Sequence, residues 1–367
     1  MPGSPYAPLF RPVEIRSLRL RNRVVMAPMT RRKAPPDGVP DERMAAYYAR
    51  RAAGGAGLIV TEGTHVDGVH APDTAGVPGI WTEAQREGWS RVADAVHRAE
   101  SPLGGRAAIA LQLWHTGRYG ADPIAPSPVP APDGKGGLGA TPREMTERDM
   151  ADVVGAFAGA ADRARRAGLD AVEIHGAHGY LLHSFLSARD NVRADEHGGA
   201  LESRARFPLR VVRAVREAAG PSLAVLYRFS QFDLEDFEAV CFPDVTSLGA
   251  WLAALREAGV DALHASAMRA TAPAFQGSPR TLAGWARQLS GLPSVAVGRI
   301  GLSDPGADGR RTVEDPAPAA RLIEEGEADL VAVGRAMIAS PDWCALVSIG
   351  RWRELPPYSP ALLDELG

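Results

Sequence analysis

The amino-acid sequence predicts a single α/β domain with a (β/α)8 barrel fold, the TIM barrel, over residues 1–367. Short apolar runs rich in β-branched residues recur eight times along the chain, and Gly, Pro or Asp bounds each run. Longer segments with a helical spacing of apolar residues separate these runs. Near-continuous apolar strands that alternate with helices are typical of a parallel sheet covered on both faces. Two doubly wound domains are the alternative, but they require a linker near the middle of the chain, where none stands out.

Each expected element has recognisable bounds. The strands are expected at residues 23–27, 57–61, 107–113, 171–175, 223–229, 262–265, 294–297 and 330–333. The helices are expected at residues 41–53, 82–99, 147–167, 201–219, 245–258, 281–290 and 317–325. Thr82 and Gln85 have the spacing of a capping box, and Gly168 stands where a C-cap glycine ends a helix. We expect the Pro- and Gly-rich segment at about residues 120–145 to form a flap over the barrel mouth, and residues 302–316 to form a second insertion, after strand seven.

Charge and composition exclude several classes of protein. The formal net charge of -3 gives no basic excess, which argues against a nucleic-acid partner. No apolar run approaches the roughly 18 residues that span a bilayer, and the first residues do not resemble a secretion signal, so we expect a cytoplasmic protein with no membrane partner. Cys241 and Cys344 are too far apart for a Cys-x-x-Cys pair. Lys33 and Lys135 are the only lysines and stand in loop-like sequence, so Schiff-base chemistry is not expected.

Polar residues and glycines recur where the expected strands end, and barrels of this type carry their active sites at that end. The short segments that contain them are Pro28, Met29 and Thr30 at strand one, Glu62 and Gly63 at strand two, Gln112 and Trp114 at strand three, His175 at strand four, Arg228 at strand five, Gly298 and Arg299 at strand seven, and Gly334 and Arg335 at strand eight. The ends of strands seven and eight form the usual phosphate site of such barrels, where glycines permit close backbone approach and arginines suit bidentate contacts. The sequence therefore predicts that this end of the barrel binds phosphate.

Two imidazoles and a phenol stand within six residues at the end of strand four, as His175, His178 and Tyr180. Imidazoles donate hydrogen bonds to an oxygen that is gaining charge, and a phenol can deliver a proton. These groups suit the polarisation of a carbonyl and the protonation of the carbon chain attached to it. A metal site is the competing interpretation of a His-x-x-His pair, but the chain has neither an HExxH motif nor a His-x-His on strand one, so we expect no metal.

Several longer motifs occur along the chain. They are residues 21–31 (RNRVVMAPMTR), 61–63 (TEG), 112–114 (QLW), 175–185 (HGAHGYLLHSF), 193–199 (RADEHGG), 202–207 (ESRARF) and 333–335 (VGR). With these motifs the chain resembles the old yellow enzyme family of FMN-dependent NADH:flavin oxidoreductases and ene-reductases, from about Leu18 to about Pro341.

The resemblance implies a role for each strand-end residue. The isoalloxazine would lie against Ala27, Pro28, Met29, Thr30, Gly63, Gln112 and Arg228, with Gln112 at the pyrimidine edge and Arg228 near N1 and O2. The phosphate would be held by Gly298, Arg299, Gly334 and Arg335. The carbonyl oxygen of an α,β-unsaturated substrate would bind His175 and His178, Tyr180 would protonate Cα after hydride reaches Cβ from flavin N5, and Trp114 would line the pocket. NADPH or NADH would be the reductant, a small activated alkene the substrate, and a homo-oligomer would be common for the family.

Other interpretations stay open at this point. An FMN barrel that catalyses desaturation or isomerisation in a biosynthetic pathway would keep these residues and alter the loops, and residues 230–242 and 302–316 look unlike those of the best-known members. A flavin-free barrel lyase or hydrolase would not need Gln112 or Arg228. His197 stands where the family usually has tyrosine, and Thr30 matches its threonine subgroup. The chain lacks the cysteine cluster of longer relatives that carry an iron–sulfur centre and a second nucleotide-binding domain, so we expect neither.

Overall fold

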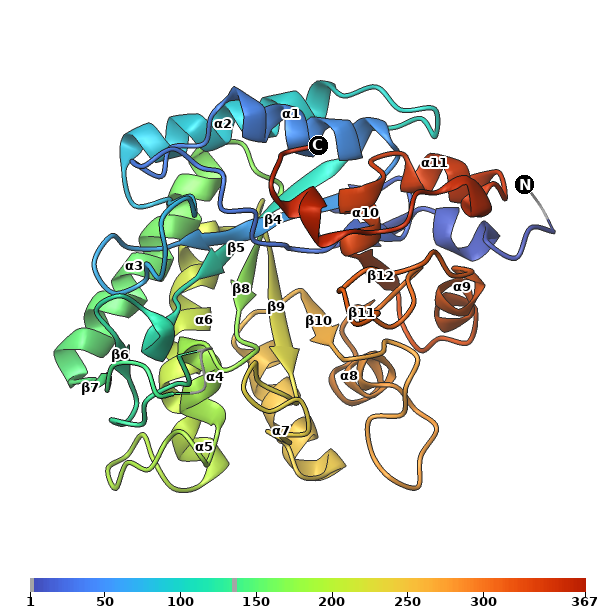
Figure 1. Ribbon diagram of the computed structural model, residues 1–367. Helices are drawn as coiled ribbons and strands as arrows, with labels where there is room; N and C mark the ends of the chain where they lie inside the picture. Colours follow the sequence, from blue (N-terminus) through green and yellow to red (C-terminus); the bar gives the residue numbers. More distant parts are fainter. Residues whose placement is uncertain (1–2, 134–136) are drawn as a thin grey trace.

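The computed structural model describes residues 3–133 and 137–367, so the predicted loop position of Lys135 falls outside the described residues. In the described ranges, eight parallel strands form a closed barrel (Figure 1). Around the barrel they are β3 (Val24–Met26), β4 (Leu58–His65), β5 (Ala108–Trp114), β8 (Ala171–His175), β9 (Ala224–Ser230), β10 (Ala262–Ser266), β11 (Ser294–Val297) and β12 (Leu330–Val333). Each strand overlaps its expected range, and the predicted fold class is confirmed.

Alternate residues of the strands point into the barrel, where small and branched side chains fill the interior. This interior cluster includes Val25, Leu58, Ala110 and Leu226. A hairpin of β1 (Val13–Ile15) and β2 (Leu18–Leu20), which the sequence analysis did not predict, adds Ile15, Leu18 and Leu20 to the same cluster. The hairpin therefore covers the barrel end at which the strands begin and leaves the opposite end free for chemistry.

Helices follow the strands and wrap the barrel (Figure 1). The longer ones are α1 (Glu42–Ala53), α2 (Glu83–Arg98), α3 (Glu147–Arg166), α6 (Arg206–Ala219), α7 (Val245–Glu257), α8 (Leu282–Ser290) and α9 (Ala317–Glu324). Thr82 and Gln85 form the expected capping box at the start of α2. The single helix expected at residues 201–219 is wrong, because α5 (Leu201–Arg204) ends before α6 begins. Pro208 has no N–H with which to bond the carbonyl of Arg204, and this interrupts the helical ladder.

Shorter elements surround the end of the barrel at which the strands finish. They are the 3-10 helix η2 (Gly117–Tyr119), β6 (Ile124–Ala125), β7 (Arg143–Glu144), α4 (Leu181–Leu186), α10 (Arg335–Ala339) and α11 (Trp343–Ser348). The segment predicted as a flap contributes β6 and β7, which pair with each other, and β6 contacts α4 and η2. In the insertion after β11, Leu302 pairs with Val313, and Arg311 pairs with Tyr358 near the chain end.

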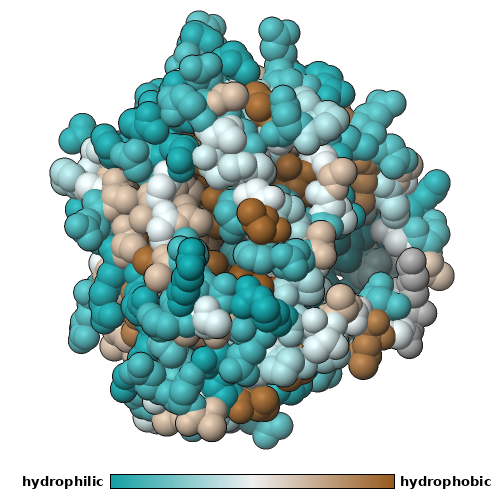
Figure 2. All heavy atoms as spheres, turned by 90° about the vertical axis from the view of Figure 1, so that its left-hand side faces the viewer, coloured by the Kyte–Doolittle hydropathy of each residue, from teal (hydrophilic) through white to brown (hydrophobic). Residues whose placement is uncertain are grey.

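The outer surface is mainly polar on the face that Figure 2 draws, and this face carries separate apolar patches. Across the described residues, no helix is both long and apolar enough to cross a membrane.

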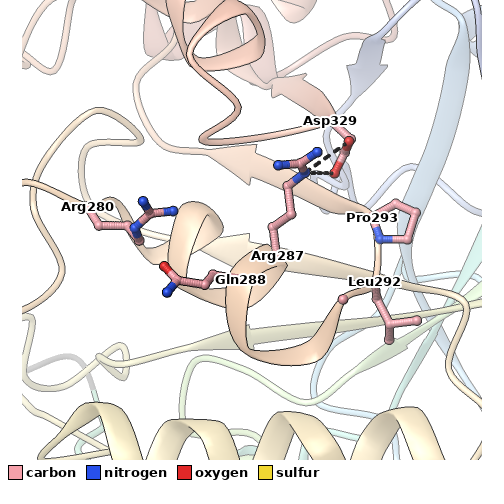
Figure 3. Close-up of a pocket in the computed structure, with 7 residues that line it drawn as sticks. Arg280, Arg287, Gln288, Leu292, Pro293 and Asp329 are labelled. Carbon is pink, nitrogen blue, oxygen red and sulfur yellow. Dashed lines mark hydrogen bonds and ion pairs between the residues drawn. The ribbon is translucent and has the colours of Figure 1, made fainter.

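A cavity of about 530 Å³ lies beside α8, close to the residues that precede β11 and β12 (Figure 3). Arg287 pairs there with Asp329 at 3.2 Å, and Asp329 also accepts a hydrogen bond from the backbone N–H of Ser294 at 3.0 Å. The charged groups are thus engaged in holding α8 to the starts of the strands. We assign this cavity a structural role, since it lies at the barrel end opposite to the predicted site.

Candidate active site

Strand register gathers the predicted residues at one mouth of the barrel. Gln112 of β5 lies beside Gly63 of β4 and beside Glu173 of β8. Arg228 of β9 lies beside His175 of β8 on one side and beside His264 of β10 on the other. Parallel strands end at the same edge, so residues far apart in the sequence form one continuous polar rim.

The side chain of Gln112 presents an acceptor to the mouth. Its Nε2 donates a hydrogen bond to Glu173 Oε1 at 2.8 Å, while Glu173 Oε2 lies 2.6 Å from His264 Nδ1. Burial raises the pKa of Glu173, but the charge of His264 and these hydrogen bonds outweigh it, and the net shift is downward. An ionised Glu173 therefore fixes the amide, and Gln112 Oε1 stays unbonded and open within the described residues.

A guanidinium donor, that of Arg228, stands on β9, which is separated from β5 by β8. Arg228 Nη2 donates to Ser266 Oγ at 3.3 Å. Burial lowers the pKa of Arg228, and the charge of Glu173 opposes that shift. In the part of the chain that the structure describes, Nε is enclosed with no partner, whereas Nη1 is unbonded and open. An open donor and an open acceptor at the same mouth complement an imide edge, in which an N–H stands beside a C=O, and the pyrimidine edge of a flavin has this pattern.

His175 is held as a neutral hydrogen-bond donor. Its Nδ1 accepts a hydrogen bond from the N–H of Ala177 at 3.3 Å, which places the ring proton on Nε2. Burial and the charge of Arg228 lower the pKa of His175 well below its ordinary value, so the ring is uncharged near neutral pH. Within the described residues Nε2 is neither bonded nor enclosed, and it is free to donate to a ligand.

His178 lies across from His175, with ring centroids 5.2 Å apart and planes at 88°. Its backbone has a left-handed φ of 65°, and its N–H donates to Ser230 Oγ at 3.0 Å. Its Nε2 lies 2.9 Å from Ser266 Oγ, so Nδ1 is the unbonded nitrogen. Burial and Arg228 lower the pKa of His178 well below its ordinary value. The ring also packs on Phe232, at a centroid distance of 5.2 Å.

Tyr180 completes this group just before α4 begins. Its ring centroid lies 5.0 Å from those of both His175 and Trp114. Burial raises the pKa of Tyr180 to about 12, with a further contribution from Asp73, so the phenol keeps its proton at neutral pH. Trp114 itself fills the space beside Gly63, because a Cβ on that glycine would stand 2.5 Å from the indole Cε3.

The chain after β3 closes the rim next to β12. Ala27 and Pro28 are buried, Met29 is half-buried and Thr30 is exposed. The N–H of Ala27 donates to the carbonyl of Val333 at 2.9 Å, which fixes the segment at the end of the neighbouring strand.

The predicted phosphate site contains a cluster of arginines. Arg299 and Arg269 both pair with Asp304, and burial together with the charges of Arg269 and Arg335 lowers the pKa of Arg299. Gly298 has φ 153°, and a Cβ there would collide with the carbonyl oxygen of residue 267. Crowded guanidinium groups at a glycine turn fit a phosphate dianion, which would relieve their mutual repulsion.

Several residues of the mouth were missed in the sequence analysis. They are His264, Ser266, Asp304 and Arg269. A signal existed for the first two, because polar residues at alternate positions of the otherwise apolar sixth strand face the same side. Among the described residues no group of three or more His, Cys, Asp or Glu side chains is arranged to hold a metal ion.

An open acceptor and an open guanidinium donor, an arginine cluster, and unbonded imidazole and phenol groups meet at one barrel mouth, and these are the groups expected in the class of flavin-binding oxidoreductase barrels. Comparison with known proteins agrees, because the model of the NADH:flavin oxidoreductase / NADH oxidase family matches residues 8–354. The chain belongs to this family, the old yellow enzyme family.

Individual relatives support the assignment. The chain is 36% identical to a NADH oxidase of Thermoanaerobacter brockii over 95% of this chain and 52% of the relative. It is 35% identical to 12-oxophytodienoate reductase 7 of Oryza sativa subsp. japonica, over 92% of this chain and 86% of the relative. The structure of morphinone reductase in complex with tetrahydroNAD has a TM-score of 0.78 and 33% identity, and the match covers 97% of this chain and 93% of that one.

These matches confirm the predicted family and, at the level of that family, FMN as cofactor and a nicotinamide nucleotide as reductant. The chain spans about half the length of the first curated relatives it matches, at 52%, 58% and 48% of their sequences. The activity of the whole protein therefore belongs to the proposal that follows.

Proposed function

We propose that the protein is an ene-reductase that uses NADPH or NADH to reduce the C=C bond of α,β-unsaturated carbonyl compounds. Bound FMN would supply the redox chemistry, which is the transfer of hydride from the nicotinamide to Cβ of the alkene. One observation supports this function above others: two unbonded imidazole nitrogens and an unbonded phenol open onto the same mouth within the described residues.

The two histidines would bind the carbonyl oxygen. His175 offers Nε2 and His178 offers Nδ1, from rings that lie nearly perpendicular to each other. Two neutral donors that converge on one oxygen stabilise the negative charge that it gains as Cβ receives hydride. Because the pKa of both rings lies well below the ordinary value, they serve as donors without carrying a charge of their own.

Tyr180 would donate the proton that reaches Cα. Its ring contacts both Trp114 and His175, so the phenol stands beside the proposed carbonyl site. A pKa of about 12 keeps the group protonated at neutral pH, which is the state a general acid requires. We assign Trp114 to the wall of the substrate pocket.

The remaining predicted residues would hold FMN. Gln112 Oε1 would accept from the imide N–H, and Arg228 would donate to the neighbouring carbonyl and balance negative charge there. We assign the backbone and side chains of Ala27, Pro28, Met29, Thr30 and Gly63 to the ring, and Gly298, Arg299, Gly334 and Arg335 to the phosphate. In these assignments the solvent-open atoms of Gln112 and Arg228 contact the flavin, and their enclosed atoms do not.

A second candidate is an FMN oxidoreductase with a specialised biosynthetic substrate. The loop after β9 favours it, because this loop departs from the best-known members and places Phe232 on the ring of His178. Such a protein would exchange electrons with NADPH but would respond poorly to a simple enone.

An anaerobic absorbance experiment separates these candidates. The spectrum of purified protein would be recorded before NADPH, after NADPH and after 2-cyclohexenone. A flavin band that bleaches with NADPH and returns with the enone is the expected result. Bleaching without return would move the assignment to the specialised enzyme, and protein that stays colourless after FMN is supplied would refute the flavin site.

A further inference from the structure

Ser266, the last residue of β10, connects the flavin side of the mouth to its substrate side. Its Oγ lies 3.3 Å from Arg228 Nη2 and 2.9 Å from His178 Nε2, and its side chain is buried. Arg228 stands on the rim assigned to the flavin, and His178 stands on the rim assigned to the carbonyl.

The hydrogen bonds of Ser266 have a direction that follows from donor counting. A guanidinium can only donate, so Arg228 gives a proton to one lone pair of the hydroxyl oxygen. The hydroxyl has a single proton, and within the described residues its only other partner is His178 Nε2. Donation from Ser266 to that nitrogen satisfies all three groups at once. His178 must then carry its own ring proton on Nδ1.

We propose that Ser266 is a positioning residue that fixes the tautomer of His178, so that Nδ1–H points its proton at the substrate carbonyl. This inference rests on the proposed function, and it adds the atom through which His178 acts. The chain of hydrogen bonds runs from Arg228 through Ser266 to His178, and each donor in such a chain strengthens the next. A change at Arg228, on the flavin side, would therefore alter the strength of the hydrogen bond that His178 donates to the substrate.

The rest of the His178 environment is consistent with this role. Ser230 accepts from the backbone N–H of His178 and donates to the carbonyl of Phe232, so its one proton is already engaged and is not donated to the ring. Phe232 covers one face of the imidazole but offers no polar group. Ser266 is the one described side chain that hydrogen-bonds the ring.

Threonine and valine side chains have nearly the same shape, so placing each of them at position 266 tests the hydroxyl itself. Ser266→Thr keeps the hydroxyl, whereas Ser266→Val replaces it with a methyl group of nearly the same volume. Each would be measured as FMN-loaded protein for the dissociation constant of 2-cyclohexenone without reductant, from the change in flavin absorbance. Loss of a hydrogen bond that orients a donor is worth roughly 1 kcal/mol, so we expect the valine variant to bind about fivefold to tenfold more weakly. The threonine variant should bind like the wild type.

The tautomer is read directly by NMR. Protein with ¹⁵N-labelled histidine rings shows which nitrogen of each imidazole carries the proton, and the His178→Gln variant identifies the signal. We expect Nδ1–H in the wild type and in Ser266→Thr, and a mixture or the Nε2–H form in Ser266→Val. Ser266→Ala adds no volume, so it repeats the valine test with no crowding and should match that variant.

Two outcomes would overturn the inference: an Nε2–H tautomer for His178 in the wild type, or equal enone affinity for the threonine and valine variants. Failure of the proposed function would look different, because wild-type protein would then not be reoxidised by the enone. The tautomer measurement needs no turnover and decides the role of Ser266 in either case.

Discussion

Replacing Tyr180 by phenylalanine tests the proposed proton donor with little structural disturbance. The ring keeps its contacts with Trp114 and His175, both at centroid distances of 5.0 Å. Among the described residues nothing hydrogen-bonds the Tyr180 hydroxyl, so its removal leaves no partner unsatisfied. A positioned general acid contributes roughly 10²- to 10⁴-fold to a rate, and we expect the alkene half-reaction to slow by that factor. Reduction by NADPH should be unchanged, because that step needs no proton from Tyr180.

The pKa of Tyr180 adds a second quantity to this test. Burial, aided by the charge of Asp73, raises that pKa to about 12. At pH 10 a phenol with the ordinary pKa of about 10 is half ionised, whereas one with a pKa of about 12 is only about 1% ionised. A depleted acid would slow the reaction as pH rises, so the raised pKa predicts that ionisation of Tyr180 causes no loss of rate up to about pH 10.

Stopped-flow absorbance measures both effects. Enzyme reduced anaerobically with one equivalent of NADPH would be mixed with 2-cyclohexenone, and the return of the oxidised-flavin band would be timed across the pH range. Tyr119→Phe is the matched control, because its ring lies 5.5 Å from that of Tyr180 but its hydroxyl donates to Glu235. A Tyr180→Phe variant reoxidised as fast as the wild type would refute the acid assignment.

Three further predictions concern the support of the site. The backbone N–H of Gly179 donates to Nδ1 of His183 at 2.6 Å, and burial lowers the pKa of His183 to about 4. His183 therefore takes up its second ring proton at a higher pH in the unfolded chain than in the native protein, so the free energy of unfolding falls as the pH drops below about 6.5. His183→Asn keeps an acceptor but does not titrate. Between pH 7 and pH 4 this variant should lose about 3 kcal/mol less of its free energy of unfolding than the wild type, measured by urea titration. Gly63→Ala would push a Cβ into Trp114, and we expect about 1–3 kcal/mol of destabilisation with weaker FMN binding, measured by thermal unfolding and fluorescence quenching; unchanged values would contradict the close contact. Glu173→Gln removes a buried negative charge, so the midpoint potential of bound flavin should rise by about 30 mV. For a two-electron couple this rise equals a tenfold change in the affinity for reduced flavin relative to oxidised flavin. A fall in the potential would contradict the prediction.

The barrel could be predicted because its signals are local and repeated. Apolar strand runs and capped helices recur with one period, and each predicted strand overlaps an observed one. The β1–β2 hairpin could not be predicted, since three-residue strands are too short to show an alternation of apolar and polar residues. The break between α5 and α6 was predictable in principle, because Pro208 is visible in the sequence and its missing N–H forbids an unbroken ladder.

The location of the site could be predicted, but its internal connections could not. Parallel strands finish at one edge, so polar residues at strand ends were expected to converge, and Gln112, His175 and Arg228 do lie at one mouth. The contact between Glu173 and His264 joins residues 91 positions apart, and no spacing along the chain reveals it. Asp304 likewise reaches the arginine cluster from an insertion that has no strand period.

The two histidines proposed to bind the substrate differ in how the fold orients their rings. His175 receives a hydrogen bond on Nδ1 from the N–H of Ala177, two residues further along, so the local turn alone decides that Nε2 carries its proton. Within the described residues no backbone N–H bonds the ring of His178, and its own N–H, on a left-handed backbone, donates to Ser230. Its ring is instead oriented from another strand, by Ser266. The sequence could therefore suggest both histidines as donors. The nitrogen that His178 would offer depends on a tertiary contact with Ser266, which no pattern along the chain reveals, so Ser266 is the residue whose substitution separates the orientation of this ring from its presence.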